Sequence, residues 1–156
     1  SGACESRILL HNADDVRQLY CLIPVLRYAD VDRAFARSGF PVRGGIVKKV
    51  DVQRGEISVR GATREPASYI KFPTAEEPFL FRRSAGDCSF EISIPCETKS
   101  GSVYFDASFA PEPAGRAASK FPEFSSGYLI VKEGNVINYA ALNAFLREFV
   151  PGLLRL

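Results

Sequence analysis

The chain has no methionine, no tryptophan and a single histidine, His11. Because it lacks an initiator methionine, we expect that it is processed or begins past its natural start. A catalytic triad would have to use His11 as its base, since no other side chain titrates near neutral pH without perturbation. There is also no Cys-x-x-Cys motif, and one histidine does not complete the usual zinc ligand sets, so we expect neither a structural zinc ion nor another cofactor.

Long hydrophobic runs are absent as well. No apolar run approaches the roughly 18 residues that a transmembrane helix needs. Of the 156 residues, 46% are hydrophobic and 24% are charged, which is typical of a globular protein and excludes disorder over most of the chain. This length corresponds to one domain, which we expect to span residues 1–156. A formal net charge of +2 is too small to indicate a nucleic-acid partner.

Four cysteines are present, and an even number in a processed chain favours disulfides in an oxidising compartment. Between Cys88 and Cys96 apolar and polar residues alternate, which predicts a single β-strand. Such a strand would hold the two Cα atoms about 26 Å apart at ~3.3 Å per residue, whereas a disulfide needs about 7 Å or less. We therefore predict disulfides that join Cys4 and Cys21 to Cys88 and Cys96, in either order. Four buried thiols in a cytosolic protein are the alternative.

The sequence contains no Asn-x-Ser/Thr glycosylation site, which removes one mark of the eukaryotic secretory route. We therefore expect an exported chain that resides in a bacterial periplasm or is anchored to an outer membrane, in preference to an extracellular one. Gly2, Ala3 and Cys4 resemble the end of a bacterial lipoprotein cleavage box, although Ser1 stands where such boxes usually carry leucine. Lipidation of Cys4 is the one link to a membrane that the sequence suggests, and a disulfide cysteine is the alternative.

The first forty residues predict helices that follow a short strand. Ser6–Leu10 is an apolar run that is typical of a strand. Asn12 is predicted to cap a helix with acidic residues in its first turn, and Pro24 ends or kinks that helix. Asp30 is predicted to cap a second helix, which ends at Gly39.

From residue 46 onwards, β-branched and alternating runs predict antiparallel strands. Two proline-rich segments are predicted to be loops: Ala62–Pro78, which contains one short strand, and Ala110–Pro122, which we expect to be mobile. Asn138 is predicted to cap a last helix, which Pro151 and Gly152 end. The predicted strands are Ile46–Val52, Glu56–Arg60, Tyr69–Phe72, Phe79–Arg82, Ser89–Ile94, Ser102–Phe109 and Tyr128–Lys132.

Together these elements predict an α+β fold. It consists of N-terminal helices, an antiparallel meander sheet of about five to seven strands, and a C-terminal helix packed on one face. Strands that follow one another without intervening helices favour antiparallel pairing, because a parallel sheet needs a long crossover between strands.

Residues 43–83 hold nine lysine or arginine residues against five acidic ones. Strand alternation would place part of them on a polar sheet face with aromatic side chains between them, which suits an acidic partner. A solvated face of mixed charge is the alternative interpretation. The residues predicted to bind a partner are Arg60, Arg64, Tyr69, Lys71, Arg82 and Arg83.

Catalytic motifs are scarce in this sequence. There is no Gly-x-Ser-x-Gly, and Gly44 and Gly45 are not followed by the lysine and hydroxyl residue of a phosphate loop. The leading hypothesis is a non-enzymatic exported protein that binds a protein partner: an inhibitor or immunity protein against a toxin or enzyme, or an envelope lipoprotein accessory factor. The alternative is a small hydrolase in which His11 works with a serine and an acid such as Asp14 or Asp15. A weaker alternative is polyanion or nucleic-acid binding through strands 43–83.

Overall fold

The computed structural model describes residues 35, 37–53 and 55–156. Within them the chain forms eleven strands, arranged in two antiparallel sheets, and two helices. The predicted strand Ser6–Leu10 and the helix predicted to begin at Asn12 lie outside the described residues. Of the second predicted helix, Phe35, Arg37 and Ser38 are described, and all three are helical.

Six strands form the first sheet, in the order β1-β2-β3-β6-β5-β4. Strands β4, β5 and β6 follow one another as hairpins, and β6 then returns to pair with β3. This is a Greek-key connection, so the predicted meander is corrected for this sheet. The strands are β1 (Phe40–Val42), β2 (Gly45–Gln53), β3 (Glu56–Thr63), β4 (Tyr69–Lys71), β5 (Leu80–Ser84) and β6 (Ser89–Pro95).

Proline and burial explain which strands are central. Strand β4 has three residues, and Pro66 and Pro73 lie close to its two ends. Proline donates no backbone hydrogen bond, so a short strand between prolines suits the edge of a sheet. Strand β6 pairs with strands on both sides, and its inward residues Phe90, Ile92 and Ile94 are all buried, as the alternation predicts.

Five strands form the second sheet, in which β11-β10-β8-β7 are neighbours and β9 pairs with β10. The sequence predicts one sheet, but β6 of the first sheet ends at Pro95, and β7 of the second sheet starts directly after Cys96. Three of these strands have only two or three residues, too few for an alternation pattern. They are β7 (Glu97–Lys99), β8 (Ser102–Asp106), β9 (Phe124–Ser125), β10 (Tyr128–Glu133) and β11 (Val136–Ile137).

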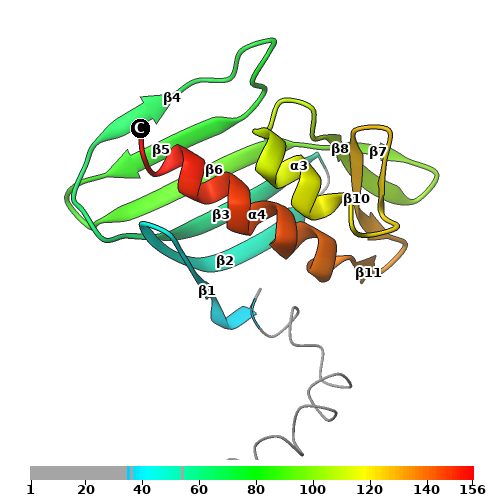
Figure 1. Ribbon diagram of the computed structural model, residues 1–156, viewed down its shortest axis with the longest axis horizontal. Coiled ribbons are helices and arrows are strands. Elements are labelled where there is room, and N and C mark those ends of the chain that lie inside the picture. The colour runs from blue at the N-terminus through cyan, green and yellow to red at the C-terminus, as the bar shows by residue number, and fades with distance from the viewer. Residues whose placement is uncertain (1–34, 36, 54) are drawn as a thin grey trace, which may run out of the picture. The chain divides into compact units, whose positions relative to one another are not determined.

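The predicted C-terminal helix is present as α4 (Tyr139–Leu153), which lies across one face of the first sheet (Figure 1). Its inward aromatic rings contact both sheets. The ring of Phe149 lies 5.2 Å from that of Phe79, just before β5, and the ring of Phe145 lies 5.2 Å from that of Phe105 on β8. The hydrophobic core therefore lies between α4 and the inner faces of the strands.

Helix α3 (Glu112–Ala118) occupies the segment for which the sequence predicts a mobile loop. Pro111 is its N-cap and Pro113 lies in its first turn, where the missing N–H costs no helical hydrogen bond. Ala114 and Ala118 are fully buried, and α3 packs against α4. The loop prediction was wrong because it took these prolines as a sign of a loop. Both lie at the N-terminal end of α3, which is the end of a helix where proline is tolerated.

The two ends of α4 differ in how well the sequence predicts them. Asn138 is the N-cap, as predicted, but its side-chain Nδ2 donates to the carbonyl of Ile130 at 3.0 Å. The helix continues to Leu153, past the end predicted at Pro151 and Gly152. Leu153 and Leu154 are buried, and this burial offsets the hydrogen bond that Pro151 does not donate.

Candidate binding face

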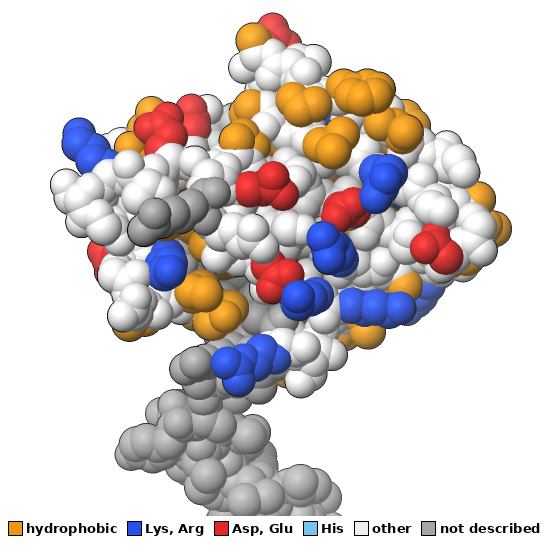
Figure 2. Space-filling model, turned by 180° about the vertical axis from the view of Figure 1, so that it is seen from behind, with side chains coloured by type: hydrophobic (Ala, Val, Ile, Leu, Met, Phe, Trp, Pro, Cys, Tyr) orange, Lys and Arg blue, Asp and Glu red, His pale blue; other side chains and the backbone are white. Residues whose placement is uncertain are grey.

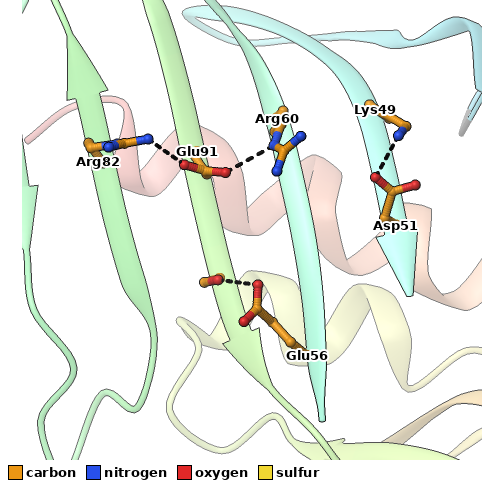
Figure 3. A network of polar contacts seen from close by, with 7 residues as sticks. Lys49, Asp51, Glu56, Arg60, Arg82 and Glu91 are labelled. Atoms are coloured by element: carbon orange, nitrogen blue, oxygen red, sulfur yellow. Dashed lines mark hydrogen bonds and ion pairs between the residues drawn. The ribbon is translucent and has the colours of Figure 1, made fainter. Parts of the chain in front are cut away.

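The first sheet has one face against α4 and an opposite face, the outer face, which is seen in Figure 2. Four charged residues meet in a line across it: Lys49 on β2, Arg60 on β3, Glu91 on β6 and Arg82 on β5. The strand register pairs Lys49 with Arg60, Arg60 with Glu91, and Glu91 with Arg82. We call these four residues the charged row (Figure 3).

Glu91 bridges the two arginines of the charged row. Its Oε1 accepts a hydrogen bond from Arg60 Nε at 2.9 Å, and its Oε2 accepts one from Arg82 Nη2 at 2.6 Å. The arginine side chains remain 59% and 60% exposed. Because each guanidinium has five N–H donors, and each arginine gives one of them to Glu91, donors remain on both arginines for a ligand.

Glu91 is ionised at neutral pH. The hydrogen bond from Arg60 is the main reason that the pKa of Glu91 lies below its ordinary value, and the bond from Arg82 adds to the effect. Lys49 pairs with Asp51 on its own strand, with Nζ and Oδ2 2.8 Å apart. Lys49 and Arg60 are nevertheless opposite in the register, and like charges in such a pair destabilise a sheet. Each of these two cations has a carboxylate partner, Asp51 for Lys49 and Glu91 for Arg60.

A hollow of about 670 Å³ lies beside the charged row. Small side chains create it, because Ala62, Ser84 and Ser89 occupy the next positions of their strands on the outer face. Asp87, in the turn between β5 and β6, lines the far end. Its Oδ1 accepts a hydrogen bond from Ser89 Oγ at 2.7 Å, and the pKa of Asp87 is lowered chiefly by that bond. The hollow thus has arginine donors along one side and a carboxylate at its end.

A second hollow, of about 500 Å³, lies at the opposite end of β3 and β6. Its walls are mostly apolar, and Glu56 is the single acidic residue among the described residues that line it. The carboxylate of Glu56 accepts a hydrogen bond from Ser93 Oγ (Figure 3). The lining residues are Gly55, Glu56, Pro73, Thr74, Pro78, Leu80, Ser93 and Pro95.

Exposed apolar side chains stand beside the charged row. Ile70 of β4 is opposite Arg82 in the register and is 52% exposed. Phe72, just after β4, is 70% exposed. Figure 2 shows hydrophobic side chains gathered next to the band of acidic and basic ones. The outer face therefore combines fixed charges, two hollows and an apolar margin.

Of the residues predicted to bind a partner, the structure brings together only Arg60 and Arg82. Tyr69 and Lys71 belong to the opposite face of the sheet, because β4 pairs Tyr69 with Arg83 and Lys71 with Phe81. Lys71 forms an ion pair with Glu77 and lies 5.0 Å from the ring of Phe79. Arg64 is exposed just beyond the end of β3, outside the charged row.

Arg83 lies in the interior, although the sequence groups it with its neighbour Arg82. Only 8% of Arg83 is exposed. Its Nη1 donates to the carbonyl of Leu154 at 3.0 Å, and its Nη2 donates to that of Glu65 at 3.4 Å. The two arginines separate because successive side chains of a strand point to opposite faces. Arg83 therefore ties β5 to the C-terminal end of α4 and is not available at the surface.

Sequence reasoning missed Lys49, Glu91 and Asp87. The alternation of residues 88–96 places Glu91 on a polar face, but only the strand order shows that β6 lies between β3 and β5. Because β3 and β6 are separated by two intervening strands in the sequence, no local pattern reveals that Glu91 stands between two arginines.

Three earlier predictions concern residues that the structure does not describe. His11, Cys4 and Cys21 lie outside the described residues, so the triad, the lipidation of Cys4 and the disulfide pairing remain predictions. Among the described residues, Cys88 and Cys96 are not joined to each other. Cys96 is partly buried just after β6, and this burial raises the pKa of its thiol to about 12.

Comparison of the chain with models of protein families, with curated proteins and with solved structures finds no match. In the described part of the chain, no helix is long and apolar enough to cross a membrane. Among the same residues, no three or more of histidine, cysteine, aspartate and glutamate are grouped so that they could hold a metal ion.

Proposed function

We propose that this chain is a non-enzymatic, exported binding protein, and that it holds a protein partner on the outer face of its first sheet. Inhibitors, immunity proteins and envelope lipoprotein accessory factors all belong to this class. The observation that carries the proposal is the pair of exposed arginines, Arg60 and Arg82, which Glu91 holds in place along the wall of a hollow.

Preorganised arginines are well suited to such a role. A guanidinium that is already oriented loses less conformational entropy when it binds a carboxylate, and arginine is enriched among the residues that dominate binding energy. Ile70 and Phe72 add exposed apolar surface beside the charged row. Carboxylates at Glu91, Asp87 and Glu56 are interspersed among the cations, and they would repel a continuous polyanion. The mixed pattern therefore favours a protein partner over a nucleic acid.

The test is affinity capture from an extract of the cells that produce the chain, with three baits. The first is the wild-type protein and the second carries Arg60→Glu and Arg82→Glu. The third carries Arg116→Glu and Lys120→Glu, an equal charge change at the exposed end of α3. Thermal unfolding confirms that all three are folded.

We expect one stoichiometric protein partner on the wild-type and Arg116/Lys120 baits. The Arg60/Arg82 bait should capture that partner at least about tenfold more weakly than the wild type, because each charge reversal places a carboxylate against a carboxylate of the partner. Equal capture by all three baits would place the contact elsewhere and contradict the use of the outer face. Absence of any partner would contradict the binding function itself, and the hydrolase hypothesis would then be tested with His11→Ala.

A further inference from the structure

The outer face has two sites of opposite charge, which we call its poles: the arginines of the charged row and the hollow that contains Glu56. The distance between these poles indicates what kind of ligand fits the face. Resting on the proposed function, we propose that this face holds an extended segment of the partner protein. In that segment an acidic side chain contacts Arg60 and Arg82, and a lysine or arginine four residues away contacts Glu56.

The anionic side chain fits the pole formed by the charged row. Arg60 and Arg82 each give one donor to Glu91, and the rest of their donors border the hollow of about 670 Å³. Arginine binds carboxylates through two parallel N–H bonds, so a carboxylate is the group that matches these forks. Ser84 and Ser89 leave room for it to approach.

The cationic side chain fits the hollow that contains Glu56. Prolines and Leu80 supply apolar walls there, and Glu56 supplies the negative charge among the described lining residues. Lysine and arginine have a long aliphatic stem and a charged end, so they cover apolar walls while the charge reaches a carboxylate. A purely apolar side chain would offer the Glu56 carboxylate no charge of opposite sign.

The distance between the poles requires an extended ligand. Glu56 and Arg60 are four residues apart on β3, which corresponds to about 13 Å at ~3.3 Å per residue. In an extended peptide, side chains four residues apart point the same way and have the same spacing. In a helix the same separation spans only about 6 Å. Ser58 and Ser93 lie between the poles, and their small side chains let a peptide backbone approach the sheet.

The experiment titrates the ¹⁵N-labelled full chain with capped heptapeptides and follows amide shifts by NMR. The matched peptide is acetyl-Thr-Asp-Thr-Val-Thr-Lys-Thr-amide, in which the charges are four residues apart. The control, acetyl-Thr-Asp-Thr-Val-Lys-Thr-Thr-amide, has the same composition with the charges three residues apart, on opposite sides of an extended chain. A third probe is single-stranded oligothymidylate.

We expect the matched peptide to shift the amides of residues 56–60 and 89–93 and to bind about fivefold more tightly than the control. Arg60→Gln should remove the preference for Asp over Asn in the peptide, and Glu56→Gln should remove the preference for Lys over Gln. Lys120→Gln, on an exposed residue after α3, should change neither.

Three results would overturn the inference: equal binding of the two peptides, no shift at this face with either one, or displacement of the matched peptide by oligothymidylate. None of these three results tests the proposed function, which is tested by affinity capture of the partner protein. A partner that requires Arg60 and Arg82 but does not compete with the matched peptide would leave the proposed function standing and reject only the extended, doubly charged ligand.

Discussion

Arg82 and Arg83 occupy successive positions of β5, and their side chains point to opposite faces of the first sheet. Arg82 is exposed and shares Glu91 with Arg60. Arg83 is buried and donates to the backbone carbonyl of Leu154, at the C-terminal end of α4. A cation at this end of a helix also interacts favourably with the negative end of the helix dipole. The same residue type therefore lies at the surface at one position and supports the fold at the next.

This difference predicts unequal effects of two matched substitutions. Arg83→Ala should lower the free energy of unfolding by about 2–3 kcal/mol, because it leaves buried carbonyls without a charged donor. Arg82→Ala should cost about 1 kcal/mol or less, since exposed ion pairs contribute little. Urea unfolding of both variants measures the difference. Equal losses would show that Arg83 does not hold the end of α4.

Glu91 predicts a dependence of stability on pH. Because Arg60 and Arg82 lower its pKa in the folded state, its ion pairs stabilise the fold above the unfolded-state pKa of about 4.3. That stabilisation is lost as the pH falls through the lower pKa of the folded state. The gap in stability between the wild type and Glu91→Gln should therefore be constant near neutrality and shrink below about pH 4.

Urea unfolding at a series of pH values measures this gap, and NMR titration of the Glu91 carboxyl checks its pKa directly. In Arg60→Gln the pKa should rise toward the ordinary value, because the main cause of the shift is gone. A gap that stays constant into acid would contradict the role given to Glu91.

At the scale of elements, periodicity predicted what is long and repetitive. It predicted β2, β3, β6, β10 and α4, each within a few residues of the observed bounds, because apolar alternation or helical spacing persists over five residues or more. It missed the two-residue strands β9 and β11, and it missed α3, whose buried face consists of alanines. The order of the strands was also missed, since pairing between distant segments is decided by the whole fold.

Helix α3 can be tested at Gly115, which lies in its middle. A Cβ added there meets no atom within 4 Å. Gly115→Ala should therefore raise the free energy of unfolding by about 0.5–1 kcal/mol, because alanine favours the helix and restricts the unfolded chain. Thermal or urea unfolding measures the change. A loss of stability would contradict the helix.

Gly61→Ala provides a comparison of opposite sign on β3. A Cβ at Gly61 would stand 2.2 Å from the carbonyl oxygen of Ile46 and 2.4 Å from the ring of Phe90. Because one of these atoms belongs to the backbone of the neighbouring strand, the sheet would have to shift, and we expect a loss of about 1–3 kcal/mol.

At the scale of the whole molecule, β6 connects the first sheet to the second. It pairs with β3 and β5, carries Glu91 on the outer face, and leads directly into the second sheet. Cys88 immediately precedes β6 and Cys96 immediately follows it. The predicted disulfides to Cys4 and Cys21 would therefore attach the N-terminal residues at both ends of this central strand.

The cysteines give a prediction for peptide mapping under non-reducing conditions. Protein isolated without reductant from the cells that produce it should yield peptides that join Cys4 and Cys21 to Cys88 and Cys96, and none that joins Cys88 to Cys96. Strand β6 separates these two residues by about 26 Å at ~3.3 Å per residue, far beyond the reach of a disulfide. A Cys88–Cys96 peptide would require β6 to be absent.

If all four cysteines are reduced, an alkylating reagent near pH 8 should modify Cys96 slowly, because burial raises its pKa to about 12 and leaves little thiolate. Finding all four cysteines reduced would reject the predicted disulfides and the predicted oxidising compartment together, while the outer face and its charged row would remain.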